Sequence, residues 1–398
     1  MSLFTAVEMA PRDPILGLNE QFNADTNPNK VNLGVGVYYD DNGKLPLLEC
    51  VLKAEKQMMD APKPRGYLPI DGIAAYDQAV KNLVFGATSE PVTAARVATV
   101  QALGGTGGLK IGADFLKRLN PSAKVLISDP SWENHRALFT QAGFTVETYP
   151  YYDAAKRGIN FEGMLAALKA APKGTVVVLH ACCHNPTGYD ISAAQWDQVV
   201  AACQEAGLVP FLDMAYQGFG YGIAEDGAVI GKFVASGLDF LVSTSFSKSF
   251  SLYGERVGGL SVLCSTKEEA DRVLSQLKIM IRTNYSNPPI HGGTVVATVL
   301  NTPELRALWE KELGDMRARI KQMRVALVEK LKAAGVKQDM SFITDQIGMF
   351  SYSGLSKDQM VRLRNEFSVY GTDTGRMCVA ALNSKNIDYV CQSIAKVL

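Results

Sequence analysis

Short apolar runs alternate with amphipathic segments through the middle of the chain. Between about residues 96 and 265, several runs have the length and β-branched content of buried strands: 97–101, 125–128, 146–149, 176–179, 208–212 and 241–244. Helical patterns separate several of them, at 107–118, 161–170 and 193–206. This alternation predicts a mainly parallel sheet covered by helices on both faces. Pro210 argues mildly against one strand, because proline cannot donate a ladder hydrogen bond.

The C-terminal third of the chain has a different pattern. Residues 303–334 are rich in Lys, Arg and Glu and predict one long, partly exposed helix. A strand at 349–352 and helices near 357–367 and 386–397 predict a smaller α+β region after it. We therefore expect a large sheet domain and a smaller domain, with the long helix as the hinge between them.

Composition narrows the class of protein. Of 398 residues, 47% are hydrophobic and 20% are charged, and 40 basic residues balance 40 acidic ones. A net charge of zero argues against a nucleic-acid or membrane-surface partner. The sequence has no secretory signal pattern and no apolar run long enough for a transmembrane helix. Seven cysteines without regular spacing favour the reducing cytoplasm over a disulfide framework.

Lys248 ends the last of the predicted strands. Burying an ammonium group is costly, but desolvation lowers the pKa of a lysine and frees its nitrogen for Schiff-base chemistry. Ser245, Ser247 and Arg256 lie close by in the sequence and are suited to hold a phosphate. An amine nucleophile beside a phosphate site indicates pyridoxal 5′-phosphate (PLP). The alternative is an ordinary surface lysine at the end of a strand.

A glycine-rich segment, Leu103–Lys110, follows a predicted strand and opens a helix. Glycines let backbone N–H groups approach an anion at a helix N-terminus. The dinucleotide pattern fails because Lys110 occupies its third glycine position, and the P-loop pattern fails at Ile111. Phosphate binding is therefore favoured over nucleotide binding, with a purely structural turn as the alternative.

Two further strands end in polar residues. Asn185 follows one and Asp213 ends another, with Tyr216 just beyond it. Ligands of parallel sheets bind at the carboxyl ends of the strands. A buried aspartate needs a cationic partner, such as a protonated pyridine nitrogen, and Tyr216 would reach the adjacent phenolic oxygen. A turn-forming asparagine and a helix-capping aspartate are the alternatives.

A zinc site is disfavoured. Cys182, Cys183, His180 and His184 cluster in the sequence, but adjacent cysteines do not readily converge on one metal and no second ligand pair completes a tetrahedron. We predict no metal.

Taken in order, the motifs resemble the aspartate/aromatic-amino-acid aminotransferase family of fold-type I PLP enzymes, and its bacterial aromatic-type members in particular. The resemblance runs from Asp13 to the C-terminus. Its most specific elements are Asn185–Gly188, Asp213–Tyr216, Ser245–Lys248, Arg282–Pro289 and Gly375–Arg376. It implies an α/β fold with a large domain, built on a mainly parallel seven-stranded sheet, and a smaller α+β domain.

The resemblance also implies roles for individual residues. Lys248 would form the Schiff base and move the proton at the substrate Cα. Asp213 would hold the pyridine nitrogen protonated, with His135 behind it. Asn185 and Tyr216 would bind the ring oxygen, and Trp132 would stack on the ring. The phosphate would be held by Gly105, Thr106, Ser245, Ser247, Arg256 and, from the other subunit, Tyr67.

Substrate recognition and assembly follow from the same resemblance. Arg376 would bind the α-carboxylate, with Asn185, Trp132 and the Gly36 backbone alongside. Arg282 of the neighbouring subunit would bind a distal carboxylate. A site shared in this way requires a homodimer. The implied division is an N-terminal arm at 1–13, a small domain at 14–45 and 316–398, and a large PLP-binding domain at 46–315.

Residues around the expected substrate side chain bear on the choice between aspartate and aromatic amino acids, and they point in both directions. Tyr39, Leu45 and Gly66 make the expected substrate shell less polar than in aspartate-restricted members, whereas Thr106, Asn287 and Val37 look like the aspartate type. We expect a broad aminotransferase that moves the amino group of aromatic amino acids and aspartate to 2-oxoglutarate by a ping-pong mechanism. The alternatives are an aspartate-restricted aminotransferase, another PLP reaction type, an NAD-dependent oxidoreductase and a non-catalytic PLP-binding regulatory domain.

Overall fold

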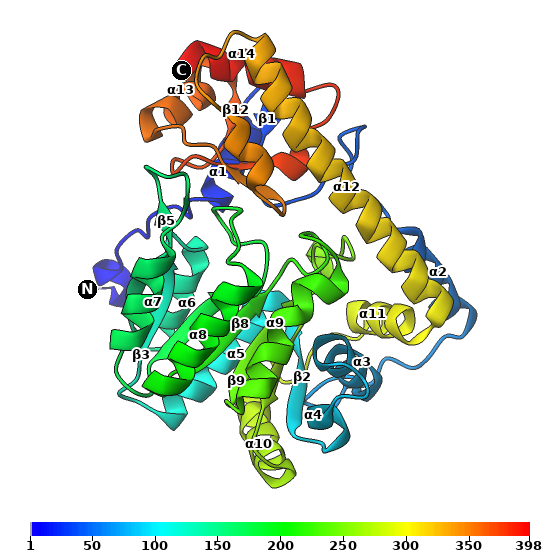
Figure 1. Ribbon diagram of the computed structural model, residues 1–398. Helices are drawn as coiled ribbons and strands as arrows, with labels where there is room; N and C mark the ends of the chain where they lie inside the picture. Colours follow the sequence, from blue (N-terminus) through cyan, green and yellow to red (C-terminus); the bar gives the residue numbers. More distant parts are fainter. Residues whose placement is uncertain (1) are drawn as a thin grey trace.

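A seven-stranded sheet forms the centre of the protein in the computed structural model, which describes residues 2–398 (Figure 1). Only β10 runs antiparallel to its neighbours, so the predicted mainly parallel sheet is confirmed. In spatial order the strands are β2 (Val97–Leu103), β10 (Val257–Leu263), β9 (Phe240–Ser245), β8 (Val209–Met214), β7 (Val176–His180), β3 (Lys124–Asp129) and β4 (Thr145–Pro150).

Side chains of the strands alternate between two hydrophobic clusters, one on each face of the sheet. In β7, Val176 and Val178 belong to one cluster, and Val177 and Leu179 belong to the other. One face is covered by α5 (Gly104–Leu119), α6 (Glu133–Gln141) and α10 (Lys267–Asn284). The other packs against α7 (Phe161–Ala170), α8 (Ala193–Ala206) and α9 (Ile223–Ser236), which lie in front of the sheet in Figure 1.

Pro210 lies inside strand β8, although its proline ring argued mildly against a strand there. It pairs in register with Val177 of β7, but the pairing of β8 with β9 begins one residue later, at Phe211. The missing N–H therefore removes no ladder bond to β9.

The pattern of apolar runs missed β10. Its two glycines, Gly258 and Gly259, obscured the strand signal. A Cβ at Gly258 would lie only 2.3 Å from the carbonyl carbon of Gly104, so a strand this close to the start of α5 needs glycine there.

The C-terminal region forms smaller sheets beside one long helix. That helix, α12 (Pro303–Ala333), matches the predicted 303–334 and runs diagonally through Figure 1. The remaining elements are α1 (Leu16–Ala24), β1 (Val31–Asn32), α2 (Glu49–Asp60), α3 (Ala74–Phe85), α4 (Glu90–Thr93), β5 (Tyr152–Asp153), β6 (Gly158–Ile159), α11 (His291–Asn301), β11 (Phe350–Tyr352), α13 (Lys357–Phe367), β12 (Val369–Tyr370), β13 (Arg376–Cys378), α14 (Ile387–Val397) and the short 3₁₀ turns Leu3–Ala6, Tyr253–Glu255, Ser341–Asp345 and Val379–Ala381.

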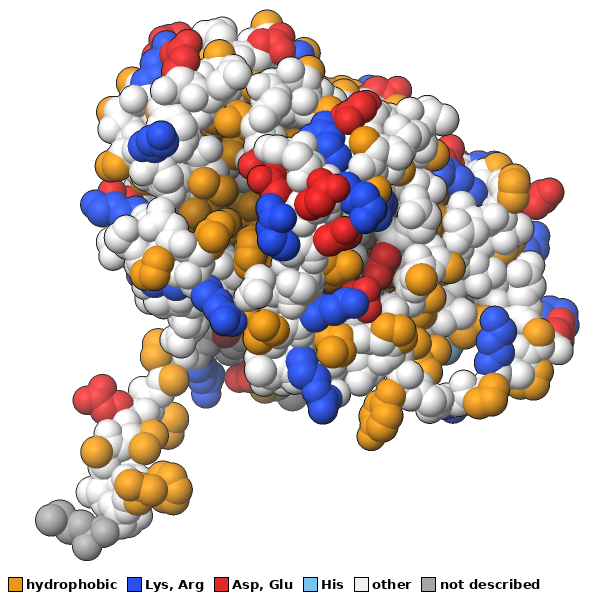
Figure 2. Space-filling view, turned by 90° about the horizontal axis from the view of Figure 1, so that it is seen from below, with side chains coloured by type: hydrophobic (Ala, Val, Ile, Leu, Met, Phe, Trp, Pro, Cys, Tyr) orange, Lys and Arg blue, Asp and Glu red, His pale blue; other side chains and the backbone are white. Residues whose placement is uncertain are grey.

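The proposed small domain joins the two ends of the chain. Strand β1 pairs in parallel with β12, bringing Val31 opposite Val369. This pairing supports the division at 14–45 and 316–398, which stays a prediction. Ahead of it, the N-terminal arm projects from the body of the molecule with its apolar side chains exposed (Figure 2). Within residues 2–398, no helix is both long and apolar enough to cross a membrane.

Candidate active site

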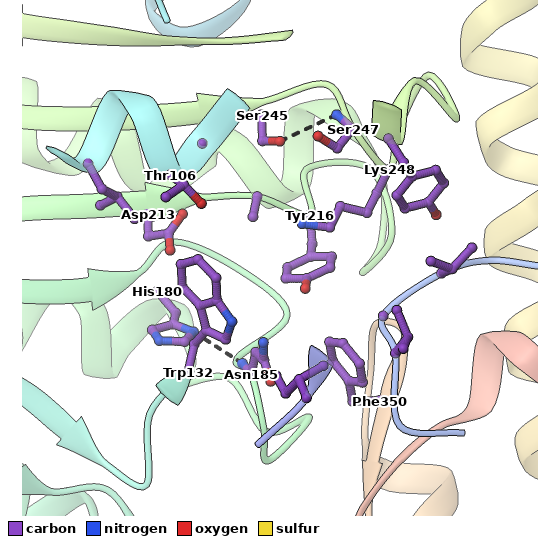
Figure 3. A pocket seen from close by; sticks show the side chains of 18 of the residues that line it. Thr106, Trp132, His180, Asn185, Asp213, Tyr216, Ser245, Ser247, Lys248 and Phe350 are labelled. Atoms are coloured by element: carbon purple, nitrogen blue, oxygen red, sulfur yellow. Dashed lines mark hydrogen bonds between the residues drawn. The ribbon is translucent and has the colours of Figure 1, made fainter. Parts of the chain in front are cut away.

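A cavity of about 370 Å³ lies at the carboxyl ends of β7, β8 and β9, against the start of α5 (Figure 3). Parallel strands direct their last residues to this edge of the sheet, which is why motifs far apart in the sequence meet here. All but three of the predicted site residues line the cavity: Gly36, Gly105, Thr106, Trp132, Asn185, Asp213, Tyr216, Ser245, Ser247, Lys248, Arg256 and Arg376.

Lys248 reaches into this cavity from the turn that follows β9. Its amine lies 4.7 Å from the centre of the Tyr216 ring, and Figure 3 shows the side chain extending toward that ring. Burial lowers the pKa of Lys248 to about 8, and the charges of Arg256 and Arg376 act in the same direction. The nearby Asp213 carboxylate opposes them. A substantial fraction of the amine is therefore neutral near physiological pH.

Asp213 is buried at the end of β8 and is supported by His135. Its Oδ2 lies 2.8 Å from His135 Nε2. Burial alone would raise the pKa of Asp213, but the hydrogen bond from His135 and the nearby positive charges hold it below its usual value. The carboxylate is thus kept ionised beneath the cavity.

A chain of hydrogen bonds sets the tautomer of His135. The backbone N–H of Asn185 donates to His180 Nδ1 over 3.1 Å, so the hydrogen of neutral His180 lies on Nε2 and faces Ser131 Oγ at 3.4 Å. Burial lowers the pKa of His180 to about 3, which keeps the ring neutral. Ser131 can then donate to His135 Nδ1 at 2.9 Å. His135 is left with its hydrogen on Nε2, directed at Asp213.

One end of the cavity is an anion cradle. It is formed by the first turn of α5, where none of the described side chains caps the free N–H groups, and by hydroxyls and a guanidinium around it. Arg256 Nη1 lies 3.2 Å from Ser247 Oγ, while the rest of Arg256 stays exposed at the rim. Gly104 has φ +69°, and a Cβ there would lie 2.4 Å from Arg256 Nη2. Glycine is therefore required for this close approach.

The other end of the cavity holds a buried arginine. Arg376 is 1% exposed, and its two terminal nitrogens donate to Asn185 Oδ1 at 3.0 Å and to the Gly34 carbonyl at 2.7 Å. Its Nε has no hydrogen-bond partner among residues 2–398. A buried cation with an unsatisfied donor, on the wall of a cavity, is suited to bind an anionic ligand.

Comparison with known proteins identifies the family. Residues 28–394 match the family model described as aminotransferase class I and II. The chain belongs to this family. It is 63% identical over 398 residues to an aspartate aminotransferase of Pseudomonas aeruginosa and 49% identical over 397 residues to an aromatic-amino-acid aminotransferase of Escherichia coli, each aligned over 100% of both chains.

Solved structures support the same family assignment. The crystal structure of an aromatic-amino-acid aminotransferase from Burkholderia pseudomallei, covalently bound to pyridoxal phosphate, is 65% identical, covers 100% of both chains and has a TM-score of 0.97. The resemblance noted in the sequence and its fold class are thus confirmed. Membership of this aminotransferase family sets aside the nicotinamide oxidoreductase and the non-catalytic regulatory domain.

Three predicted residues lie outside the cavity of this aminotransferase chain. His135 stands behind Asp213, as expected. Tyr67 is 95% exposed, and Arg282 lies on the surface, where it donates to Ser286 Oγ. The expectation that Tyr67 and Arg282 serve the site of a second subunit stays a prediction.

The sequence analysis missed several residues of the cavity wall, most of them apolar: Ile15, Leu16, Val35, Leu109, Ala215, Tyr253 and Phe350. No chemical motif marks such residues, because only the fold brings them to the cavity. His180 and Cys182, weighed only as metal ligands, also line it. The thiols of Cys182 and Cys183 do approach Asp226, but the oxygens of Asp226 accept N–H groups of Gly218, Gly220 and Tyr221.

The pKa of Lys248 can be tested directly. In the cofactor-free aminotransferase, labelling of Lys248 by an amine-reactive reagent should rise with pH around a midpoint near 8, because the neutral amine is the reactive form. Asp213→Asn removes the charge that favours the ammonium, so its midpoint should move to lower pH. Site-resolved mass spectrometry gives the rates, with exposed lysines of the same sample as the reference. Identical midpoints in the two proteins would contradict the electrostatic coupling.

Proposed function

We propose that this aminotransferase moves the amino group of aromatic amino acids and of aspartate to 2-oxoglutarate, with PLP as its cofactor, by a ping-pong mechanism. The observation that carries the proposal is the Lys248 amine, held between an anion cradle and the unsatisfied guanidinium of Arg376. Relatives named for each substrate class support it: the aspartate enzyme already described and a tyrosine aminotransferase of Klebsiella pneumoniae, 49% identical over 397 residues.

The cavity fits PLP group by group. The first turn of α5, Ser245, Ser247 and Arg256 would hold the phosphate. Asp213 would pair with the pyridine nitrogen, and Asn185 and Tyr216 would bind the phenolic oxygen. Burial raises the pKa of Tyr216 above its usual value, so its hydroxyl stays a hydrogen-bond donor. PLP, when bound, supplies an electrophilic carbon for an amine and a ring that withdraws electrons from the substrate Cα.

The protein's own residues would then carry out proton transfer. With a pKa of about 8, Lys248 would accept a proton from the substrate Cα and return it, because a general acid–base works best with a pKa near the operating pH. Asp213 keeps its negative charge through the His135 hydrogen bond and so favours a protonated pyridine nitrogen. Trp132 would lie against the ring face.

Substrate binding follows from charge and shape. Arg376, with Asn185 and the Gly36 backbone, would hold the α-carboxylate shared by every substrate. The cavity wall near Arg376 is apolar at Val35 and Phe350, which favours acceptance of an aromatic side chain. An aspartate-restricted enzyme is the second candidate, supported by the 63% identity to the Pseudomonas aspartate aminotransferase.

A homodimer is part of the proposal. The exposed positions of Tyr67 and Arg282, and the apolar side chains exposed on the N-terminal arm, suit contacts with a second subunit. Arg282 would reach the distal carboxylate of aspartate or 2-oxoglutarate in the partner's site. We also place the enzyme in the cytoplasm, since all seven cysteines are buried free thiols.

Lys248→Ala tests the proposed reaction. The variant should bind PLP through the remaining phosphate and ring contacts but lose turnover by at least about 10³-fold, because Lys248 is the one lysine of residues 2–398 that lines the cavity. Steady-state rates with phenylalanine and aspartate, together with cofactor content, provide the measurement. Lys232→Ala, which removes an ion pair with Asp197 on the surface, is the matched control. Activity of Lys248→Ala near that of the control would rule out the assigned role.

Arg282→Ala tests how one site serves two substrate classes. The loss in kcat/KM should be about 10²-fold for aspartate, because a charge-assisted bidentate contact is removed, and within about threefold for phenylalanine. Both values come from steady-state assays on the same preparation. Equal losses for the two substrates would remove Arg282 from recognition of the distal carboxylate.

A further inference from the structure

Helix α12 contains a buried arginine outside the site described so far. Arg324 is 3% exposed, although the sequence around it predicted a partly exposed helix. Burial lowers the pKa of Arg324 to about 10, so it is still cationic at neutral pH. The titratable groups around it are the thiols of Cys183 and Cys378 and the phenol of Tyr189, which are uncharged at neutral pH, and no carboxylate of residues 2–398 forms an ion pair with it. A cation buried in this way needs strong hydrogen-bond acceptors.

Main-chain carbonyls of one short segment supply those acceptors. Arg324 Nη2 donates to the carbonyls of Gly348, at 2.7 Å, and of Phe350, and Nη1 reaches the Ile343 carbonyl at 3.4 Å. These contacts bracket the turn that leads into β11. Gly348 has φ +81°, and a Cβ there would lie 2.7 Å from the Cβ of Cys183, so the turn is closely packed on its other side as well. Arg324 therefore fixes the backbone on which Phe350 stands.

The ring of Phe350 is a wall of the carboxylate site. Its centre lies 4.4 Å from the Cζ of Arg376, in cation–π geometry, and its edge meets Tyr216 with 5.8 Å between ring centres and planes at 85°. A Cβ at Gly36 would lie 2.7 Å from the ring. Phe350 thus contacts residues from three separate parts of the site, and Figure 3 shows its ring below that of Tyr216.

Other donors of α12 hold the backbone next to further site residues. Trp309 donates to the carbonyl of Ser249, which follows Lys248, and Arg319 donates to the carbonyl of Tyr39 in the segment after Gly36. Through these hydrogen bonds, α12 fixes a loop of the proposed large domain and a loop of the proposed small domain relative to one another. Among these donors, Arg324 acts on the segment that carries Phe350.

We propose that Arg324 is a positioning residue for the α-carboxylate site. It holds the carbonyl of Phe350 itself and the carbonyl of Gly348, two residues earlier, and the Phe350 ring in turn fixes the guanidinium of Arg376. The role rests on the proposed function, because the anion that Arg376 binds is there taken to be the substrate carboxylate. Loss of Arg324 should weaken carboxylate binding far more than cofactor binding, because the proposed phosphate cradle lies at the other end of the cavity.

The experiment compares, for each variant of the PLP-binding dimer, the affinity for carboxylate ligands with the affinity for PLP. Arg324→Met should raise the KM for phenylalanine and for 2-oxoglutarate, and the Kd of the carboxylate inhibitor 3-phenylpropanoate, by about tenfold. Its kcat should stay within about threefold of wild type and its Kd for PLP within about twofold. Arg324→Lys keeps the charge but lacks the fork of donors, so its effects should be intermediate. Arg306→Met, on the exposed side of the same helix, should match wild type.

Equal losses of 3-phenylpropanoate and PLP affinity in Arg324→Met would overturn the proposal, because a general structural role weakens both. Unchanged affinity for 3-phenylpropanoate would overturn it too. If Arg324→Met does not fold, Phe350→Leu replaces it, since this variant keeps the carbonyls that Arg324 needs and removes only the ring. It should show the same selective loss, and equal or absent losses would again refute the role. Wild-type protein that binds 3-phenylpropanoate but does not convert phenylalanine would instead count against the proposed function.

Discussion

Burial of charge inside one cavity is the constraint on which the site depends. Lys248, Arg376 and Asp213 all face one cavity, where the charges of Asp213, Arg376 and Arg256 act on the Lys248 amine. Each charge can be buried there only because its surroundings reduce the cost of burial. The pKa of Lys248 is lowered, and His135 hydrogen-bonds to Asp213. Arg376 donates to the side-chain amide oxygen of Asn185 and to the carbonyl of Gly34. The compensation is incomplete, because Arg376 Nε has no partner among residues 2–398, and the proposed anionic ligand would complete it.

Much of this arrangement could be predicted from the sequence because parallel strands follow simple rules. Apolar runs of four or five residues located most strands of the sheet. Since such strands present their last residues at one edge, the polar residues after β7, β8 and β9 had to meet there. Lys248, Asp213 and Asn185 were found for this reason. Burial and charge already suggested the Schiff base for Lys248 and the pyridine nitrogen for Asp213, and the resemblance to aminotransferases supplied the remaining roles.

The rest could not be predicted because it depends on packing across long separations in the sequence. Phe350 lies in an ordinary apolar strand, and nothing near it indicates a contact with Arg376 or Gly36. Arg324 lies in a segment predicted only as a long, partly exposed helix, and a helical pattern cannot reveal its buried acceptors, because Gly348 and Phe350 lie more than twenty residues later. Strand β10 was missed because its glycines serve a close contact with α5. In each case the residue type was set by tertiary structure.

The most direct test is the half-reaction of the purified, PLP-loaded protein, mixed separately with phenylalanine and with aspartate in the absence of any oxo acid. Absorbance should change from that of the pyridoxal form of the bound cofactor to that of the pyridoxamine form with both amino acids. Conversion by aspartate alone would contradict the broad specificity and favour the aspartate-restricted enzyme. Conversion by neither, with cofactor bound, would contradict the proposed reaction itself.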